Sequence, residues 1–167
     1  MLITALGMAR KNHEVSVAAC RGGVLEGRAR EAGLQVHPIG FHGDLSPAAV
    51  FRLARAIRSF HPDIVHAHDA HALGTACLAL RAYPAAALVA SRRVDFALRN
   101  AFSRLKYLQA RRIIAASRAI AAVLNRDGIP DNRIRVVYEG VPDRNPRPGG
   151  KDILRELGVP DGCMVVG

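Results

Sequence analysis

The chain has no tryptophan, few other aromatic residues and no long hydrophobic run. Phe, Tyr and Trp together make up 5% of the 167 residues, and alanine and leucine outnumber the β-branched residues. This composition argues against an all-β sandwich or barrel. No stretch of 18 or more apolar residues is present, so the sequence contains no candidate transmembrane helix. Half of the residues are hydrophobic and 23% are charged, which is unlike a disordered chain.

Cysteine is scarce, and no secretory signal is visible. Cys20, Cys77 and Cys163 are far apart and odd in number, so they form neither a CxxC pair nor a disulfide framework. We interpret them as small core residues of a protein in a reducing compartment. The apolar stretch 2–8 is short, and Lys11 follows it where a leader would have a basic residue before it. The sequence therefore predicts a cytoplasmic protein.

Lysine is also rare, and the basic charge comes from arginine. Only three of the 24 basic residues are Lys, and with 14 acidic residues the net charge is +10. An arginine-rich composition can reflect a GC-rich genome, or it can indicate an anionic partner. Seven basic residues and only one acidic residue, Asp95, lie between Arg92 and Arg112. This region is either a core helix with a solvated basic face or an amphipathic surface that touches anionic lipid at the inner face of a membrane.

Several common motifs are absent. The sequence has no GxSxG elbow, no GxGxxG, no Walker A and no CxxC, so it lacks the signatures of an α/β-hydrolase, a dinucleotide site or a P-loop. Nucleic acid is not an expected partner, because no aromatic-interleaved basic patch is present. The pair Gly22-Gly23 follows an expected strand and indicates a turn.

Apolar stretches of strand and helix type alternate along the chain. Strands are expected at residues 14–19, 34–39, 63–68, 85–90, 112–116, 134–138 and 163–166. Helices are expected at residues 1–11, 24–32, 46–61, 70–81, 96–108, 117–126 and 152–157. This alternation predicts an α/β protein with a Rossmann-like parallel sheet and helices on both faces. Ligands of such sheets bind at the carboxyl ends of the strands.

The most polar of these strand ends is His66-Ala67-His68-Asp69-Ala70-His71. Alternation along a strand places His66 and His68 on the same side. Three functions remain open for this segment: a polar pocket for substrate hydroxyls or an acid–base histidine, a structural strand end with Asp69 as helix cap, and a metal site. The metal reading would make the protein a metal-dependent hydrolase that uses His66, His68, Asp69 and His71.

Two further strand ends carry candidate residues. Ser91, Arg92 and Arg93 follow the expected strand 85–90, and two arginines there suit a phosphate or a carboxylate. Asp95 can instead pair with one of them structurally. Ser117 opens a helix after strand 112–116, either as a plain cap or as a contact to a substrate anion at the helix N-terminus.

Four stretches in this order resemble the amino-terminal domain of GT-B glycosyltransferases of the family-4 type. The resemblance is carried by LITALGMARKNHEVSV (2–17), HPDIVHAHDAH (61–71), RIIAASRAI (112–120) and RIRVVYEGVP (133–142). It implies transfer of a sugar from a nucleotide-sugar to a hydroxyl with retention of configuration, in bacterial cell-envelope polysaccharide or lipopolysaccharide synthesis. It also implies no cofactor and no metal, and a sugar or lipid-linked acceptor on this side of the cleft.

The resemblance also implies which residues line the acceptor side. These are His66, His68, Asp69, Ser91, Arg92, Arg93, Ser117, Glu139 and Gly140. Gly140 matches the family's glycine at the cleft edge, whereas Glu139 stands where asparagine is common and Asp143 comes one residue later than the usual acid. Ser91-Arg92-Arg93 stands where a histidine often follows the strand, so no catalytic residue is assigned.

The ends of the chain differ from the family's pattern. The family begins with a strand and a glycine-rich turn before the first helix, and its donor-binding domain carries a paired-Glu motif. We therefore expect residues 1–157 to be an acceptor-side domain without its first strand, and 158–167 to be a linker and the first strand of a donor-binding domain. Such a fragment is expected to be inactive alone. A self-standing flavodoxin-like binding module is the alternative.

Overall fold

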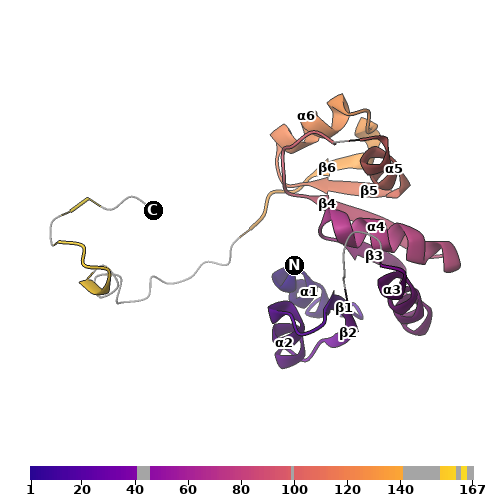
Figure 1. Cartoon of the computed structure of the whole chain (residues 1–167), viewed down its shortest axis with the longest axis horizontal. Coiled ribbons are helices and arrows are strands. Elements are labelled where there is room, and N and C mark those ends of the chain that lie inside the picture. Colours follow the sequence, from indigo (N-terminus) through magenta and orange to yellow (C-terminus); the bar gives the residue numbers. More distant parts are fainter. Residues whose placement is uncertain (41–45, 99, 141–154, 161–162, 165–167) are drawn as a thin grey trace.

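The fold is built from parallel strands in two groups. The computed structural model describes residues 1–40, 46–98, 100–140, 155–160 and 163–164. In these residues β1 (Ser16–Cys20) pairs with β2 (Gln35–Ile39). A second sheet has the order β3-β4-β5-β6, formed by β3 (Ile64–Ala67), β4 (Ala87–Arg92), β5 (Arg112–Ala115) and β6 (Ile134–Val136). All neighbouring strands are parallel, so the predicted α/β class with parallel pairing is confirmed (Figure 1).

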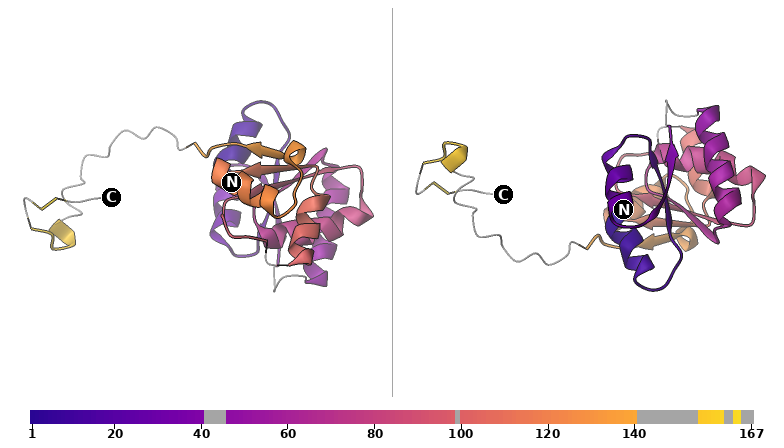
Figure 2. Two further views of the ribbon diagram at one scale, coloured as in Figure 1. Left: turned by 90° about the horizontal axis from the view of Figure 1, so that it is seen from above. Right: turned by 90° about the horizontal axis from the view of Figure 1, so that it is seen from below.

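The sheet is divided between β1 and β3. No strand of the described residues pairs with the free edge of either one. The two groups are nevertheless joined through α3 (Pro47–Phe60), which contacts β2 on one side and α4 (Ala70–Ala79) on the other. Views from above and below keep α1 (Leu2–Ala9) and α2 (Val24–Glu31) at one side of the body and α3 at the other (Figure 2).

Side-chain caps fix where most of the helices begin. Ser46 and Ser117 accept the amide hydrogens of Ala49 and Ile120, and so cap α3 and α6 (Arg118–Arg126). For Ser117 this is one of the two roles considered from the sequence. Gly33, with φ +76°, follows α2 in the left-handed conformation expected of a residue that ends a helix. Helix α5 (Ala101–Gln109) is capped by Asn100, whose side chain accepts from the Ser103 amide at 2.8 Å.

Most of the core lies around the four-stranded sheet. Its largest fully buried side chains are Ile39, Leu73, Ile113, Leu124 and Ile129. A smaller core joins Val17, Ala19 and Ala29 to partly buried residues of α1 and α2. The larger sheet is therefore the more firmly packed platform, and it positions the polar strand ends.

Two boundaries differ from the prediction. β4 continues through Ser91 and Arg92, so these residues belong to the strand and do not follow it. The expected helix 96–108 begins only at Ala101, because residues 93–98 are irregular and Asn100 provides the cap. The Asp127 carboxylate accepts the Leu98 amide hydrogen at 2.6 Å and holds this irregular segment.

Part of the expected carboxyl-terminal organisation falls outside the description. Residues 141–154, 161–162 and 165–167 lie outside the described residues. They include Asp143, most of the loop after β6, half of the expected helix 152–157 and half of the expected strand 163–166. The assignment of 158–167 to a second domain therefore stays a prediction.

Candidate functional site

A polar cluster forms where β3 and β4 end. His66 lies in β3 and Ser91 in β4, and the two strands are paired in register from Ile64 with Ala87 to Ala67 with Ala90. The His66 Nε2 and the Ser91 Oγ are 2.8 Å apart. Ser91 is buried, so this hydrogen bond joins the two strand ends beneath the surface.

His66 and His68 lie against each other, as alternation along the strand predicts. Their ring centroids are 4.0 Å apart. Burial lowers the pKa of His66, and the positive charge of Arg93 lowers it further. Burial, followed by the His66 ring and Arg93, lowers the pKa of His68 to about 3. Both imidazoles are therefore neutral at physiological pH and act as hydrogen-bonding groups.

Arg93 connects the ends of three strands. Its Nη1 donates to the His68 carbonyl oxygen at 3.0 Å, and its Nη2 lies 3.2 Å from the His68 Nδ1. Its Nε donates to the Glu139 carboxylate, which follows β6. This hydrogen bond and the charge of Arg93 lower the pKa of Glu139. Because arginine only donates, Nδ1 of His68 accepts and its proton sits on Nε2.

Arg92 points away from this cluster. Its side chain is only 7% exposed; Nη1 donates to the Tyr107 hydroxyl at 3.2 Å and Nη2 to the Phe96 carbonyl oxygen. The guanidinium carbon lies 5.4 Å from the centroid of the Tyr107 ring, and Nε has no hydrogen-bond partner among the described residues. Arg92 thus connects the segment that follows β4 with helix α5. Arg93, by contrast, belongs to the polar cluster.

Of the other predicted site residues, Asp69 and Ser117 cap helices, and Gly140 is exposed. Asp69 accepts the amide hydrogens of His71 and Ala72 at 2.9 and 2.8 Å, which is the capping role considered for it. Ser117 caps α6. Gly140 is exposed, and among the described residues other than its chain neighbour no atom lies within 4 Å of the position its Cβ would take. The cluster is therefore formed by His66, His68, Ser91, Arg93 and Glu139.

No metal-ligand set is visible in the described part of the chain. There, no three His, Cys, Asp or Glu side chains are grouped as a metal ion would require. Asp69 directs its carboxylate to the backbone of α4, so it is not free to join His66 and His68 as a ligand. The hydrolase alternative finds no support in this geometry.

Sequence reasoning overlooked two supporting residues. Tyr107 is buried and receives Arg92, and Asp127 holds the Leu98 amide. Tyr107 lies within the expected helix 96–108, and Asp127 directly follows the expected helix 117–126. Neither spacing carries a signal for a contact with a segment many residues away.

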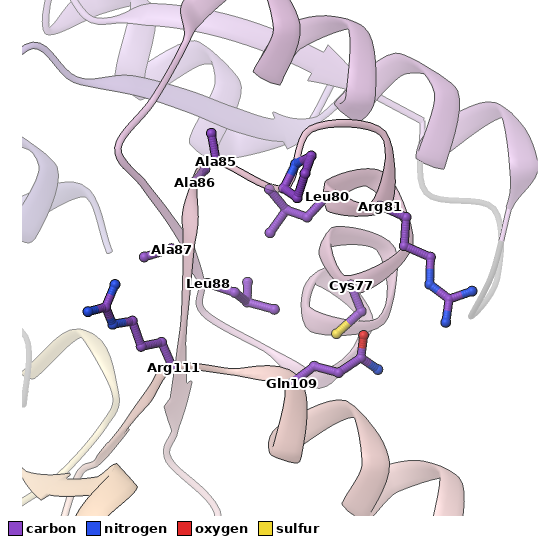
Figure 3. A pocket seen from close by; sticks show the side chains of 10 residues that line it. Cys77, Leu80, Arg81, Ala85, Ala86, Ala87, Leu88, Gln109 and Arg111 are labelled. Carbon is purple, nitrogen blue, oxygen red and sulfur yellow. The ribbon is translucent and has the colours of Figure 1, made fainter.

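A hollow lies at the opposite end of the sheet. It has a volume of about 450 Å³ and is lined by Cys77, Leu80, Arg81, Pro84, Ala85, Ala86, Ala87, Leu88, Gln109 and Arg111. Ala87 is the first residue of β4, so this hollow faces the amino ends of the strands (Figure 3). Burial raises the pKa of the Cys77 thiol there. None of the predicted site residues lines it.

None of the helices in the described residues is long and apolar enough to span a lipid bilayer.

Comparisons with known proteins agree on the fold. The family model described as Glycosyltransferase Family 4 matches residues 2–144. No curated protein sequence matches the chain.

Among solved structures, Anabaena Alr3699/HepE in complex with UDP-glucose aligns with a TM-score of 0.67 at 16% identity, over 94% of this chain and 45% of that one. The same protein with UDP and glucose gives 0.64 at 16% identity, over 94% and 46%. A putative UDP-N-acetylglucosamine 2-epimerase from Listeria monocytogenes gives 0.57 at 17% identity, over 80% and 40%. The chain thus has the fold of one Rossmann-like half of such proteins and spans less than half of their length.

Proposed function

The chain belongs to glycosyltransferase family 4, and from this membership we propose that it forms the acceptor-side half of an enzyme that transfers a sugar, with retention, from a nucleotide-sugar to a hydroxyl group. The family match over residues 2–144 is the observation that carries the proposal. The polar cluster at the strand ends supports it, because ligands of parallel α/β sheets bind at that edge.

We propose that the donor is bound by a second, donor-binding half of the enzyme. The HepE structures hold UDP-glucose, or UDP and glucose, and we propose a UDP-sugar as the donor class here. Stabilisation of the departing diphosphate would then fall mainly to that second half, as electrostatic catalysis requires donors placed where charge develops. We assign no cofactor, no metal and no catalytic residue to the present chain.

The chemistry of the cluster suits recognition of hydroxyl groups. His68 carries its proton on Nε2 and can donate it to an acceptor oxygen, while Nδ1 is held by Arg93. His66 and Ser91 are hydrogen-bonded to each other beside His68. Neutral imidazoles do not attract the diphosphate of the donor, so the two histidines are suited to the uncharged part of an acceptor.

The proposal is tested by saccharide binding to the 167-residue chain on a glycan array. We expect binding to a subset of glycans that is lost in His66→Ala, because the variant removes an imidazole of the polar cluster and its hydrogen bond with Ser91. His13→Ala is the matched control, since His13 is exposed and lies after α1. Binding that survives His66→Ala would contradict the acceptor role of this edge.

The chain by itself should not transfer sugar. Incubation with radiolabelled UDP-sugars and the glycans that bind on the array is expected to give no labelled product, because we propose that residues 1–157 form only the acceptor-side half of the enzyme. Labelled product from the purified chain would overturn this division of labour.

We also propose peripheral contact with an anionic membrane at its inner face, through the segment that precedes α5 and through α5. Phe96 is 69% exposed, and Phe102 and Leu105 are also exposed. The Lys106 Nζ lies 5.4 Å from the centroid of the Phe102 ring, so apolar and basic groups are adjacent. Such a combination favours the interface of an anionic bilayer.

Vesicle cosedimentation tests this contact. Vesicles that contain phosphatidylglycerol should retain the chain, and the double variant Phe96→Ser, Phe102→Ser should release it. Phe51→Ser is the control, because Phe51 on α3 is as exposed as Phe96. Equal binding by both variants would show that this surface is not the contact.

A further inference from the structure

We propose that Arg93 recognises an oxyanion of the acceptor, a phosphate or a carboxylate group, and that Glu139 holds this arginine until the oxyanion displaces it. This inference rests on the proposed glycosyltransferase function, because it specifies which acceptors the site takes. Of the adjacent arginines, Arg92 is buried against Tyr107, whereas Arg93 contacts His68 in the polar cluster.

The backbone and His68 fix the orientation of the Arg93 guanidinium. Nη1 and Nη2 both face His68, at its carbonyl oxygen and its Nδ1. Of the five N–H donors of an arginine, the three contacts of Arg93 use one each from Nη1, Nη2 and Nε. The remaining hydrogens of Nη1 and Nη2 stay available to a ligand, and the side chain is 36% exposed.

The Glu139 carboxylate can be displaced from Arg93 by a ligand. Its side chain is 58% exposed, and in the described residues it makes no hydrogen bond other than that with Arg93. Exposed ion pairs contribute little to stability, because both charges remain well solvated. An incoming oxyanion therefore takes the place of the Glu139 carboxylate beside Arg93, and the positive charge of Arg93 stays balanced.

The rest of the cluster is uncharged. His66, His68 and Ser91 offer hydrogen bonds and no net charge, so they cannot neutralise Arg93 once Glu139 leaves. Arginine binds phosphate and carboxylate groups through parallel N–H···O bonds, a geometry that a lysine does not offer. The arrangement points to an acceptor with an oxyanion close to the hydroxyl that receives the sugar.

Nuclear magnetic resonance of the imidazole signals tests the proposal directly. Inorganic phosphate should shift the signals of His66 and His68 in the wild-type chain. Glu139→Gln should strengthen phosphate binding by about twofold to fivefold, because a competing carboxylate of an exposed pair is removed. Arg93→Gln should abolish the shifts, and Arg93→Lys should weaken them.

A matched variant and a neutral ligand provide the controls. Arg111→Gln changes an exposed arginine at the opposite end of the sheet and should leave phosphate binding unchanged. Glucose 6-phosphate and glucuronate should bind more tightly than glucose. Vesicles of phosphatidate, compared with glucose 6-phosphate, distinguish a lipid-borne from a soluble phosphate.

The outcomes separate this inference from the function on which it rests. Phosphate shifts that persist in Arg93→Gln, or weaker binding by Glu139→Gln, would overturn the role of these residues. Equal affinity for glucose and glucose 6-phosphate would do the same. If such results accompany glycan binding that still depends on His66, the site takes neutral acceptors and the proposed function stands.

Discussion

His66 and His68 illustrate how a residue's neighbours decide its chemistry. An isolated histidine titrates near pH 6.5. Here, burial and the adjacent Arg93 oppose a positive charge on either ring, and His68 is the more strongly affected. The two rings are therefore unsuited to donate a proton as a general acid near neutral pH, and suited to stable hydrogen bonds.

We predict that acid destabilises the fold through His68. The unfolded chain protonates this residue near its ordinary pKa of 6.5, whereas the folded chain does so only at about 3. Between these values the unfolded state binds more protons, so the free energy of unfolding should fall as the pH is lowered through this window. Urea unfolding at pH 7 and pH 5 measures the difference.

A paired variant isolates the contribution of His68. His68→Gln should show a smaller loss between pH 7 and pH 5 than the wild-type chain, and His13→Gln should leave the loss unchanged. An identical pH dependence in His68→Gln would show that other groups control acid stability.

We predict that two glycine-to-alanine changes act in opposite directions. Gly128 has φ +84°, where an L-residue is strained by roughly 1–2 kcal/mol. A Cβ there would lie 2.6 Å from Nη2 of Arg104, an exposed guanidinium that can move aside, so the backbone carries the cost. Gly27 is exposed within α2, and alanine there should stabilise by roughly 0.5–1 kcal/mol.

Thermal unfolding of both variants checks this prediction. Gly128→Ala should lower the melting temperature and Gly27→Ala should raise it. A stable Gly128→Ala protein would mean that the turn after α6 can adopt another conformation.

At the scale of the element, Asp69 shows how a candidate ligand can be a helix cap. We predict that Asp69→Ala costs about 1 kcal/mol, the usual effect of losing a capping side chain, because two amide hydrogens of α4 lose their acceptor. Asp69→Asn keeps an acceptor oxygen and should be almost as stable as the wild type. Denaturant unfolding and the glycan array together decide the role. Loss of glycan binding by a stable Asp69→Asn protein would instead assign Asp69 to the acceptor.

The strand ends show what the sequence could predict. Alternation in β3 correctly placed His66 and His68 on one side. The same rule separates Ser91 and Arg93 from Arg92, but only when β4 is extended to Arg92, and the apolar run 85–90 gave no reason to extend it. Hence the three residues were grouped, although Arg92 lies against Tyr107 on the other side.

Helix starts could be predicted from the sequence where they depend on local contacts. Ser46 and Ser117 directly precede helices and make the local hydrogen bonds that define a cap, so sequence reasoning located them. The start of α5 at Ala101 depends partly on contacts made at a distance. Asp127 and Arg92 hold the preceding segment through Leu98 and Phe96, and nothing local in residues 96–100 indicates those partners.

At the scale of the molecule, the two groups of strands differ in how they are held. β1 has one neighbouring strand, and its core consists of Val17, Ala19 and Ala29 with partly buried neighbours. β4 and β5 have a strand on each side and lie over a core with several large buried side chains. More apolar surface is buried per strand in the second group, so its opening costs more free energy.

We therefore predict that residues 1–36 open before the four-stranded sheet does. Amide hydrogen exchange followed by mass spectrometry should show lower protection in α1, β1 and α2 than in β4 and β5, because local opening follows the local burial of apolar surface. The candidate site belongs entirely to the second group, since its five residues come from β3, β4 and the segments that follow β3, β4 and β6. The His66 and His68 signals should accordingly persist at urea concentrations that already expose α1 and α2. Uniform protection across both groups, or simultaneous loss of the site signals, would instead mean that α3 couples the two sheets into one cooperative unit.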